Sequence, residues 1–290
     1  MDWKMRSRWV AVFAVAVLAG TPQFGRAADP GLRVPTWLAD RGEGIPTSLF
    51  GTYVREKELL FYPFYEYTKY KNYEYSPKDF KVSNSDREFF GKATIHEALI
   101  FLAYGFTDSL ALEFESAAYT RADFTKDPTD NTAVPSRLRE SGLGDTEINL
   151  RYRYIKETAT RPEVTFFFKA GFPFQKKKLL IGTQGWEFSP GVVLTKGFGS
   201  FGTMALRLST NYSREERKNE FSEYAVDYIK QLNQSWRAVL SIEGDGDEIA
   251  GIGELQYRLA KNAVLKLNLG LGLTKKAPDY APEIGVMFNF

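Results

Sequence analysis

The chain has 290 residues, with 38 basic and 36 acidic side chains and no cysteine, which gives a formal net charge of +2. Residues 1–28 hold four basic side chains and one acidic one, so the remainder carries about −1. These values exclude a disulfide-bonded scaffold and remove the compositional support for nucleic-acid binding. Aromatic residues make up 15% of the chain, which fits a membrane barrel better than a secreted sandwich.

The N-terminus has the features of a secretory signal peptide. The first eight residues are basic, residues 9–20 are apolar, and Ala27 and Ala28 precede Asp29. The apolar run is too short to cross a bilayer comfortably as a helix, and no later run is long enough. We predict a signal peptide over 1–28 that is cleaved near Ala27 or Ala28, a periplasmic leader or plug over 29–55, and a barrel over 56–290.

Twelve segments of side-chain period two follow, each long enough to cross a membrane as a tilted strand. They occupy residues 57–71, 92–105, 109–121, 144–157, 162–174, 186–197, 200–213, 219–230, 235–244, 248–260, 263–274 and 281–290. Their connectors alternate between short (107–108, 157–161, 197–199, 233–234, 261–262) and longer and more polar (72–91, 122–142, 175–185, 213–218, 244–247, 275–280). This alternation predicts an all-β, transmembrane, antiparallel up-and-down β-barrel of about twelve strands.

Charged residues in the middle of these segments determine which face is which. Every odd position from Leu265 to Leu273 is leucine, while Lys266 lies on the opposite face of the same segment. A charge on the lipid face at the bilayer midplane costs about 2–4 kcal/mol, and a dry sandwich core would exclude it as firmly. We therefore expect apolar residues to face lipid and charges to face a polar lumen, with a narrow or partly plugged pore.

The predicted lumen-lining residues carry both signs of charge. They are Glu113, Glu115, Glu147, Arg151, Arg153, Lys169, Arg207, Asp227, Arg237, Glu243, Glu254, Arg258 and Lys266, and Glu187 and Glu283 share their face. They could form an electrostatic constriction that selects solutes. They could also form cross-strand pairs that fill and rigidify the interior, which the mixture of signs favours.

Catalytic and metal-binding signals are weak, so we predict no enzyme activity, no catalytic residues, no metal and no cofactor. The single histidine, His96, falls on an outward face, and Ser116 on the next segment lies near the opposite end of the strand pair without a Gly-x-Ser-x-Gly motif. The acidic run 243–248 could hold calcium, but a solvated tight turn is the simpler interpretation. Residues 142–145 are glycine-rich without the strand-to-helix context of a nucleotide site.

Aromatic clusters and the C-terminus complete the pattern. The runs 61–67 and 166–174 are typical of the aromatic girdles of barrels, although a path for apolar solutes with Phe61 or Phe167 facing inward is an alternative. In the last segment one face ends in Phe288 and Phe290, which we expect to close the barrel and to act as the signal for the barrel-assembly machinery.

Several segments together carry a family resemblance: 44–54 (GIPTSLFGTYV), 102–112 (LAYGFTDSLAL), 141–147 (SGLGDTE), 171–174 (GFPF) and 186–188 (WEF). From about residue 44 to the C-terminus, the chain resembles the transporter-like outer-membrane proteins grouped under a meta-pathway of phenol degradation. The resemblance implies a channel-like barrel for hydrophobic or aromatic compounds and supplies no catalytic residues.

The leading hypothesis is a channel of the bacterial outer membrane for passive uptake of small solutes, hydrophobic or aromatic ones included. The expected partners are outer-membrane lipid, the barrel-assembly machinery and a small solute, with no nucleic acid. Three alternatives stay open: a non-conducting structural or anchoring barrel with a charge-filled lumen, a lipid-modifying barrel enzyme that depends on His96, and a soluble secreted β protein.

Overall fold

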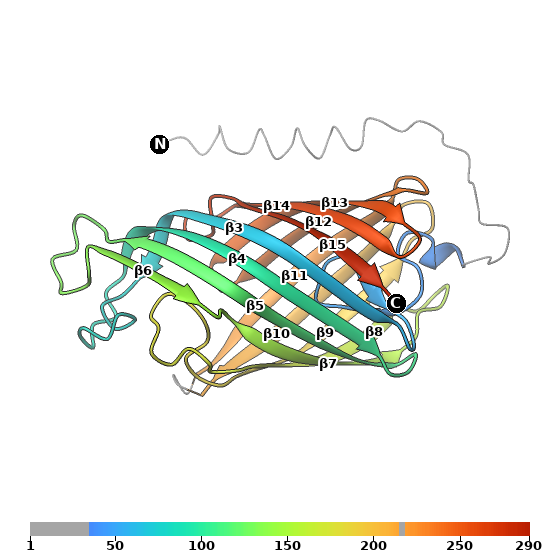
Figure 1. Ribbon diagram of the computed structural model, residues 1–290. Coiled ribbons are helices and arrows are strands. Elements are labelled where there is room, and N and C mark those ends of the chain that lie inside the picture. The colour runs from blue at the N-terminus through green and yellow to red at the C-terminus, as the bar shows by residue number, and fades with distance from the viewer. Residues whose placement is uncertain (1–34, 215–217) are drawn as a thin grey trace. The chain divides into compact units, whose positions relative to one another are not determined.

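The computed structural model describes residues 35–214 and 218–290, and nearly all of its strands belong to one antiparallel sheet that closes on itself (Figure 1). The predicted signal peptide lies outside the described residues. A short N-terminal part contains the 3₁₀ turn η1 (Thr36–Leu38) and a separate two-stranded hairpin of β1 (Ile45–Pro46) and β2 (Tyr53–Val54). Within the described ranges, no helix is long and apolar enough to cross a membrane.

The closed sheet contains thirteen strand segments. They are β3 (Leu59–Tyr75), β4 (Phe89–Gly105), β5 (Leu110–Thr125), β6 (Arg137–Gly142), β7 (Thr146–Ile155), β8 (Glu163–Gly171), β9 (Glu187–Gly197), β10 (Thr203–Ser213), β11 (Lys218–Gln231), β12 (Trp236–Asp245), β13 (Glu248–Ala260), β14 (Ala263–Gly272) and β15 (Ala281–Asn289). Both β6 and β7 pair with β5, one beyond the other, so they occupy a single place in the wall. The barrel therefore has twelve strand positions, as the sequence predicts.

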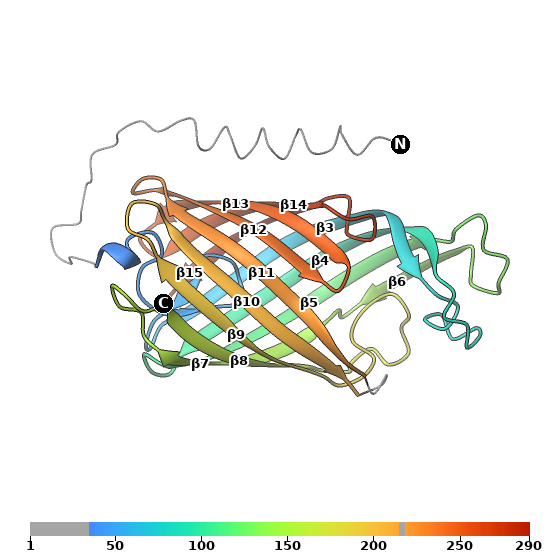
Figure 2. The same cartoon turned by 180° about the vertical axis from the view of Figure 1, so that it is seen from behind.

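The barrel closes where β15 pairs with β3. Gly285 lies opposite Phe64, and Phe288 lies opposite Phe61. The backbones of Leu59 and Phe290 exchange two further hydrogen bonds, of 3.1 and 2.9 Å. Closure joins the first and last of the twelve strands, so free edges in the described part of the chain are left only where β3 to β6 extend outward beyond their neighbours. The backbone groups of the ring itself are therefore paired without help from water, as a lipid environment requires. Figure 2 shows the same wall from behind, where β9 to β13 run side by side.

Each of the twelve predicted segments coincides with a strand position. The predicted alternation of connector lengths is present from β3 to β9 and at 273–280, but the connectors 214–217 and 246–247 are no longer than the short ones beside them. Two long connectors, 72–91 and 122–142, are shorter than predicted, because β3, β4 and β5 extend further outward and β6 forms a strand within 122–142. The predicted connector 244–247 is a turn of only two residues, since β12 ends at Asp245 and β13 begins at Glu248. The end with the short connectors and the C-terminus is the periplasmic end by the usual rule for bacterial barrels.

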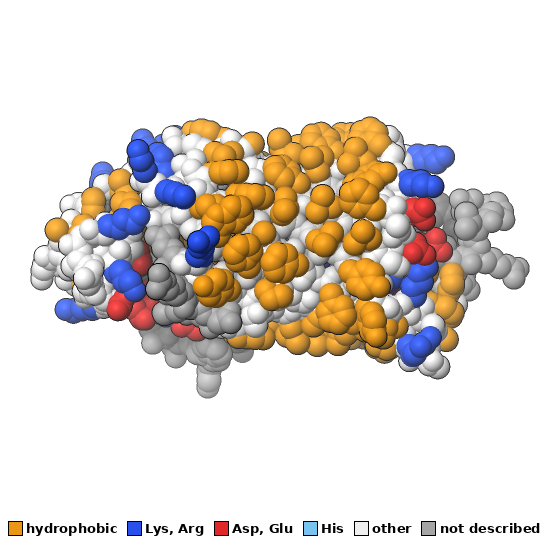
Figure 3. Space-filling model, turned by 90° about the horizontal axis from the view of Figure 1, so that it is seen from below, with side chains coloured by type: hydrophobic (Ala, Val, Ile, Leu, Met, Phe, Trp, Pro, Cys, Tyr) orange, Lys and Arg blue, Asp and Glu red, His pale blue; other side chains and the backbone are white. Residues whose placement is uncertain are grey.

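The alternation of faces is seen directly in β7. Its apolar side chains Ile148 and Leu150 are 36% and 45% exposed, whereas Asn149 and Arg151 between them are 3% and 1% exposed. The leucines of β14 behave in the same way around the buried Lys266. Figure 3 shows a broad band of apolar side chains across the face in view, with charged side chains gathered towards both ends. The outer face is therefore apolar and the inner face polar, as expected.

We predict that the apolar band makes stability depend on depth in the membrane. Leu267→Arg places a cation near the middle of β14 on the outer face and should lower the free energy of unfolding by about 2–4 kcal/mol. Leu273→Arg, just beyond the end of β14, should cost at most about 1 kcal/mol. Chemical denaturation of both variants in phosphatidylcholine vesicles measures the difference, and equal losses at the two positions would contradict an apolar band that meets lipid.

Candidate functional site in the barrel lumen

The N-terminal segment, defined here as residues 35–58, is coloured blue in Figure 1. Its turn η1 lies at the periplasmic opening, and its hairpin of β1 and β2 lies inside the barrel near that end. One side of its hairpin is apolar. Ile45 and Val54 are 1% and 0% exposed and pack in a cluster with Tyr62 of β3 and Phe101 of β4. The hairpin is therefore attached to the wall on the β3–β5 side by a small apolar core.

The tip of the same hairpin forms hydrogen bonds both with β5, on the side of its apolar core, and with β10, on the facing side of the wall. The Ser48 N–H donates to Glu113 Oε1 of β5 at 3.1 Å, and Arg207 of β10 donates to the Ser48 carbonyl at 3.2 Å. Because β5 and β10 are separated by three strand positions on the shorter path around the barrel, these two contacts stretch the tip across the lumen.

Two further strands, β12 and β13, also bond to the tip. Arg237 Nη1 donates to the Gly51 carbonyl at 2.9 Å, and Gln256 Nε2 donates to the Phe50 carbonyl at 3.3 Å. Gly51 has a φ of +61°, and a Cβ there would lie 2.7 Å from Val239, so the tip fits the wall only with glycine at this position. The hairpin is thus bonded to strands around much of the barrel.

Buried ion pairs stand directly beside these contacts. Arg151 Nε lies 2.7 Å from Glu113 Oε1, and Lys266 Nζ lies 3.3 Å from Glu254 Oε2, with each of the four side chains at most 2% exposed. Lys266 also donates to Thr52 Oγ1 of the hairpin. A charge buried to this extent is costly without its partner, so the pairs and the hairpin contacts support one another.

A second group of charges holds the segment closer to the periplasmic opening. Arg41 is 3% exposed and lies 2.9 Å from Glu157 and 3.4 Å from Glu163, and its guanidinium stacks 4.9 Å from the Tyr53 ring. Glu163 also pairs with Arg153 of β7 at 3.0 Å. Neither partner of Arg41 is near it in sequence, so only the closed barrel brings these groups together.

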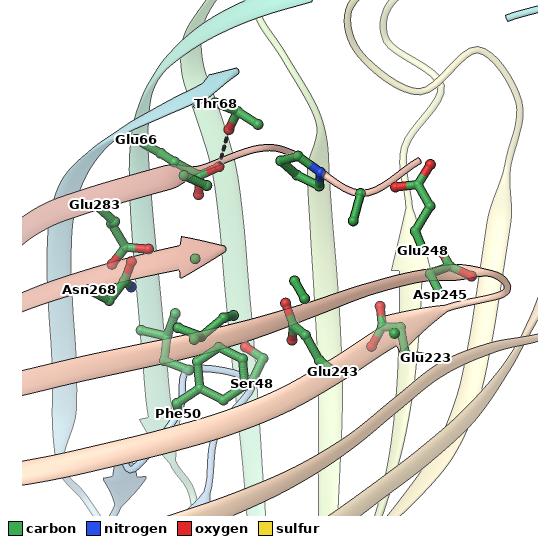
Figure 4. Close-up of a pocket in the computed structure, with 18 of the residues that line it drawn as sticks. Ser48, Phe50, Glu66, Thr68, Glu223, Glu243, Asp245, Glu248, Asn268 and Glu283 are labelled. Atoms are coloured by element: carbon green, nitrogen blue, oxygen red, sulfur yellow. Dashed lines mark hydrogen bonds between the residues drawn. The ribbon is translucent and has the colours of Figure 1, made fainter. Parts of the chain in front are cut away.

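On the extracellular side of the hairpin the lumen opens into a cavity of about 540 Å³. Ser48 and Phe50 of the hairpin tip line one end of it, and charged side chains surround the rest (Figure 4). Nine carboxylates and three cations line this cavity. A second cavity of about 860 Å³ lies further along and shares Glu147, Lys169 and Glu223 with the first.

The carboxylates of the cavity include a row across three adjacent strands. In the strand register, Glu283 of β15 lies opposite Glu66 of β3, and Glu66 lies opposite Glu97 of β4. In the neighbouring pair of strands, Glu115 lies opposite Glu147. Like charges directly opposite one another destabilise a sheet, so this arrangement is not explained by strand pairing.

The carboxylates of this row accept hydrogen bonds from neutral hydroxyl groups and, within the described ranges, have no cation beside them. Thr68 donates to Glu66 at 2.7 Å, Thr120 donates to Glu97 at 2.6 Å, and the Tyr62 hydroxyl donates to Glu283 at 2.6 Å. By contrast, Lys169 lies between Glu147 and Glu223, and Arg207 lies 3.4 Å from Glu243. Among the described residues, Glu66, Glu97, Glu115 and Glu283 therefore have no ion-pair partner.

The structure distributes the sequence-predicted lumen residues over three levels. Six of them line the cavity: Glu115, Glu147, Arg151, Lys169, Arg207 and Glu243. Glu113, Arg237, Glu254 and Lys266 lie at the level of the hairpin tip, with Asp227, which accepts from Ser241 at 2.6 Å. Arg153 belongs to the group around Arg41, whereas Arg258 is exposed towards the end of β13 and does not line the cavity.

Sequence reasoning missed Glu66, Glu97 and Glu223 of the cavity and Asp40 and Arg41 of the N-terminal segment. The first two could have been found from alternation. Glu66 is flanked by the outward Tyr65 and Tyr67, and Glu97 follows the outward His96, so both must face the lumen. No periodic signal existed for the N-terminal segment.

The weaker candidates are distributed as follows. His96 bonds to the Tyr65 hydroxyl at 2.6 Å on the outer face, while Ser116 is buried and bonds to Thr146 at 2.8 Å, so the two do not form a pair. Although the alternation of β5 predicts an outward position for Ser116, its contact with Thr146 leaves it buried. No group of residues in the described ranges is arranged to hold a metal ion. Of the two aromatic candidates, Phe167 lines the cavity, whereas Phe61 stacks on Phe288 and faces outward.

The chain was compared with known proteins. No protein-family model and no curated protein matches it. Among solved structures, it resembles an outer-membrane channel from Pseudomonas putida F1, with a TM-score of 0.55 and 12% identity over 82% of this chain and 97% of that chain. The fold is that of a bacterial outer-membrane β-barrel.

Lower-scoring similarities include other outer-membrane barrels. One is the KdgM porin in complex with disordered oligogalacturonate, with a TM-score of 0.48 and 11% identity over 80% of this chain and 99% of that chain. Another is the CymD monoaromatic hydrocarbon channel, with a TM-score of 0.40 and 9% identity over 82% and 89% of the two chains. The closed wall and its apolar outer band place this protein in the outer membrane.

We predict that the hairpin tip forms the floor of a cavity that water reaches from the extracellular side. The chain has no cysteine, so a single introduced thiol reports on one position. Ser48→Cys, at the floor, should react with a membrane-impermeant thiol reagent added outside intact cells. Thr52→Cys, 3% exposed and not part of the cavity lining, should stay unmodified. Mass spectrometry of the purified variants measures labelling, and protection of Ser48→Cys would mean that the cavity is not open to the outside.

Proposed function

We propose that this protein is an outer-membrane channel for small solutes and that residues 35–58 act as its plug. The observation that carries the proposal is the cavity of about 540 Å³, which ends on the hairpin tip. A solute that enters from outside reaches Ser48 and Phe50 and can go no further while the hairpin is in place. Passage therefore requires the segment to move.

The bonding of the segment is suited to such movement. Its contacts with β10, β12, β13 and β14 are hydrogen bonds and charge contacts, which water can replace when the segment leaves. Its largest apolar contact is the cluster at β3–β5, and smaller apolar contacts with Val239, Ile229 and Val193 lie on the facing side. Because hydrogen bonds and charge contacts make up most of the bonding on that facing side, we propose that the hairpin detaches from it first.

The charge of the cavity favours solutes that carry positive charge. Four carboxylates, Glu66, Glu97, Glu115 and Glu283, face it without ion-pair partners in the described residues. The side chain of Asn149, 3% exposed, also lines the cavity, and its Oδ1 accepts no hydrogen bond there. Rings of carboxylates are the usual device by which a pore favours cations.

An apolar or aromatic body on the solute is compatible with the same cavity. Tyr70, Ile95, Phe167 and Ile252 line it between the charged groups. The resemblance to the transporter-like proteins grouped under a meta-pathway of phenol degradation supports a hydrophobic or aromatic solute class. We accordingly propose small organic solutes as cargo, with a cationic group giving the preference. The protein acts without catalysis in this proposal.

The second candidate is a closed structural or anchoring barrel, and one observation favours it. The ion pairs of Glu113, Arg151, Glu254 and Lys266 fill the lumen at the level of the hairpin, and all four side chains are nearly inaccessible. Such pairs rigidify an interior. The two candidates differ in whether removal of the N-terminal segment opens a conducting path.

We predict that deletion of residues 36–54 raises the single-channel conductance of the refolded protein severalfold in planar lipid bilayers. The full chain should conduct little, because the hairpin crosses the lumen. A matched control is Arg161→Gln, which alters an exposed residue of a periplasmic turn and should leave conductance unchanged. If the shortened barrel is folded and still does not conduct, the structural candidate is the correct one.

We also predict that the unpaired carboxylates set ion selectivity. In the conducting, shortened barrel, Glu66→Gln with Glu97→Gln should lower the permeability of potassium relative to chloride, because two of the cavity's uncompensated negative charges are removed. Glu56→Gln with Glu88→Gln removes two exposed carboxylates outside the cavity and should have little effect. Reversal potentials in a salt gradient measure the ratio.

Reversing the charge of Arg151 or Arg207 should increase the cation preference, and unchanged selectivity in all these variants would exclude the cavity as the selecting region.

A further inference from the structure

The outer face of β3 to β6 carries a basic surface next to the extracellular end of the apolar band. Its six cations are Lys69, Lys71, Lys92, Arg121, Arg137 and Arg139. The strand register shows that they are near one another. Lys92, Thr125 and Arg137 are successive partners across β4, β5 and β6. Two residues closer to the membrane, Thr94, Asp123 and Arg139 are partners across the same three strands.

The position of this basic surface relative to the membrane follows from the aromatic residues beside it. Tyr65 and Tyr119 are 43% and 51% exposed on the outer face, and the ring of Tyr67 lies 5.8 Å from that of Tyr280. Exposed tyrosines of this kind mark the boundary between hydrocarbon and headgroups. Lys69 and Arg121 are the next outward residues after Tyr67 and Tyr119, so the cations begin at headgroup level.

Only part of the basic charge is neutralised within the protein. Arg121 and Arg139 share the single carboxylate of Asp123, and Lys71 pairs with Asp279 at 3.0 Å. Lys92 and Arg137 are exposed and have no ion pair among the described residues. A surface with this excess of cations attracts anions, and arginine in particular suits phosphate oxygens.

The cations of the basic surface lie on strand faces, whereas other exposed cations of the extracellular end, such as Lys176, Lys177 and Arg214, lie in the connectors after β8 and β10. On the other strands, the outward side chains close to the extracellular ends include Tyr212, Phe221, Ile242 and Leu271, all more than a third exposed. Cations that only solvate the rim can lie in such connectors and have no reason to gather on the outward faces of four neighbouring strands. A ligand bound on these strand faces explains the gathering.

We propose that this basic surface binds the phosphorylated glycolipid of the outer leaflet, with its phosphates on the cations and its acyl chains on the adjoining apolar band. The wall supplies both halves of such a site. Lys92 and Arg137 are two strand spacings apart, about 10 Å, so one headgroup with two phosphates can contact both. The apolar chains lie against the outward apolar side chains next to Tyr65 and Tyr119, such as Ile100 of β4.

The test is the affinity of the full-length protein, in detergent micelles, for lipid A that carries two phosphates, measured by native mass spectrometry. The key variant is Lys92→Gln with Arg137→Gln. The matched control is Lys261→Gln with Arg161→Gln, which removes one exposed lysine and one exposed arginine from periplasmic turns. Lys92→Arg with Arg137→Lys keeps both charges, and heat-modifiable gel mobility checks that every variant is folded.

The key variant should bind the lipid about tenfold to thirtyfold more weakly than the unaltered protein. The periplasmic control and the charge-keeping variant should bind as tightly as the unaltered protein, and lipid A stripped of its phosphates should bind all four forms equally weakly. Two results would overturn the proposal. One is an equal loss of affinity in the key variant and the periplasmic control, and the other is equal binding of phosphorylated and dephosphorylated lipid by the unaltered protein.

Discussion

The structure depends on one constraint, which is that a wall surrounded by hydrocarbon must satisfy its own backbone hydrogen bonds. The pairing of β15 with β3 meets this requirement by joining the first and last of the twelve strands. Once the wall is closed, every strand has one face towards lipid and one towards the lumen, and side chains alternate between them. The buried charges of Arg151 and Lys266 are a consequence, since the lumen is the polar side.

The lumen then has to accommodate a large number of charges, and the N-terminal segment is central to how it does so. At the level of the hairpin tip, cations from β10, β12 and β14 bond to the segment's backbone or side chains while Glu113 accepts from Ser48. Above the hairpin, nine carboxylates and three cations face a cavity, and four of the carboxylates have no ion-pair partner among the described residues. The same segment therefore separates a region of paired charges from one with an excess of negative charge, and this separation underlies both the proposed plug and the proposed cation preference.

Sequence periodicity predicted the wall well because lipid and lumen impose opposite demands on alternate residues. The odd-numbered leucines from Leu265 to Leu273 and the charges of β7 carry that signal clearly. This alternation is lost where a strand extends beyond the membrane, because both of its faces then meet water. The outer ends of β3 to β5 and the whole of β6 were therefore predicted as loops. It also gave no information on Arg41, whose partners Glu157 and Glu163 lie 116 and 122 residues away. Such contacts follow from closure of the barrel, which no local pattern encodes.

The central claim is that the hairpin of β1 and β2 is bonded across the lumen of the folded barrel. Hydrogen–deuterium exchange of residues 45–54, in the protein embedded in lipid nanodiscs, tests it most directly. The amides of Thr47, Ser48 and Thr52 donate to Thr52 O, Glu113 Oε1 and Leu49 O at 2.9, 3.1 and 3.2 Å. We expect these amides to exchange far more slowly than an unstructured chain, with protection that falls when Glu113 is replaced by alanine. Exchange at the rate of a free peptide would contradict the account.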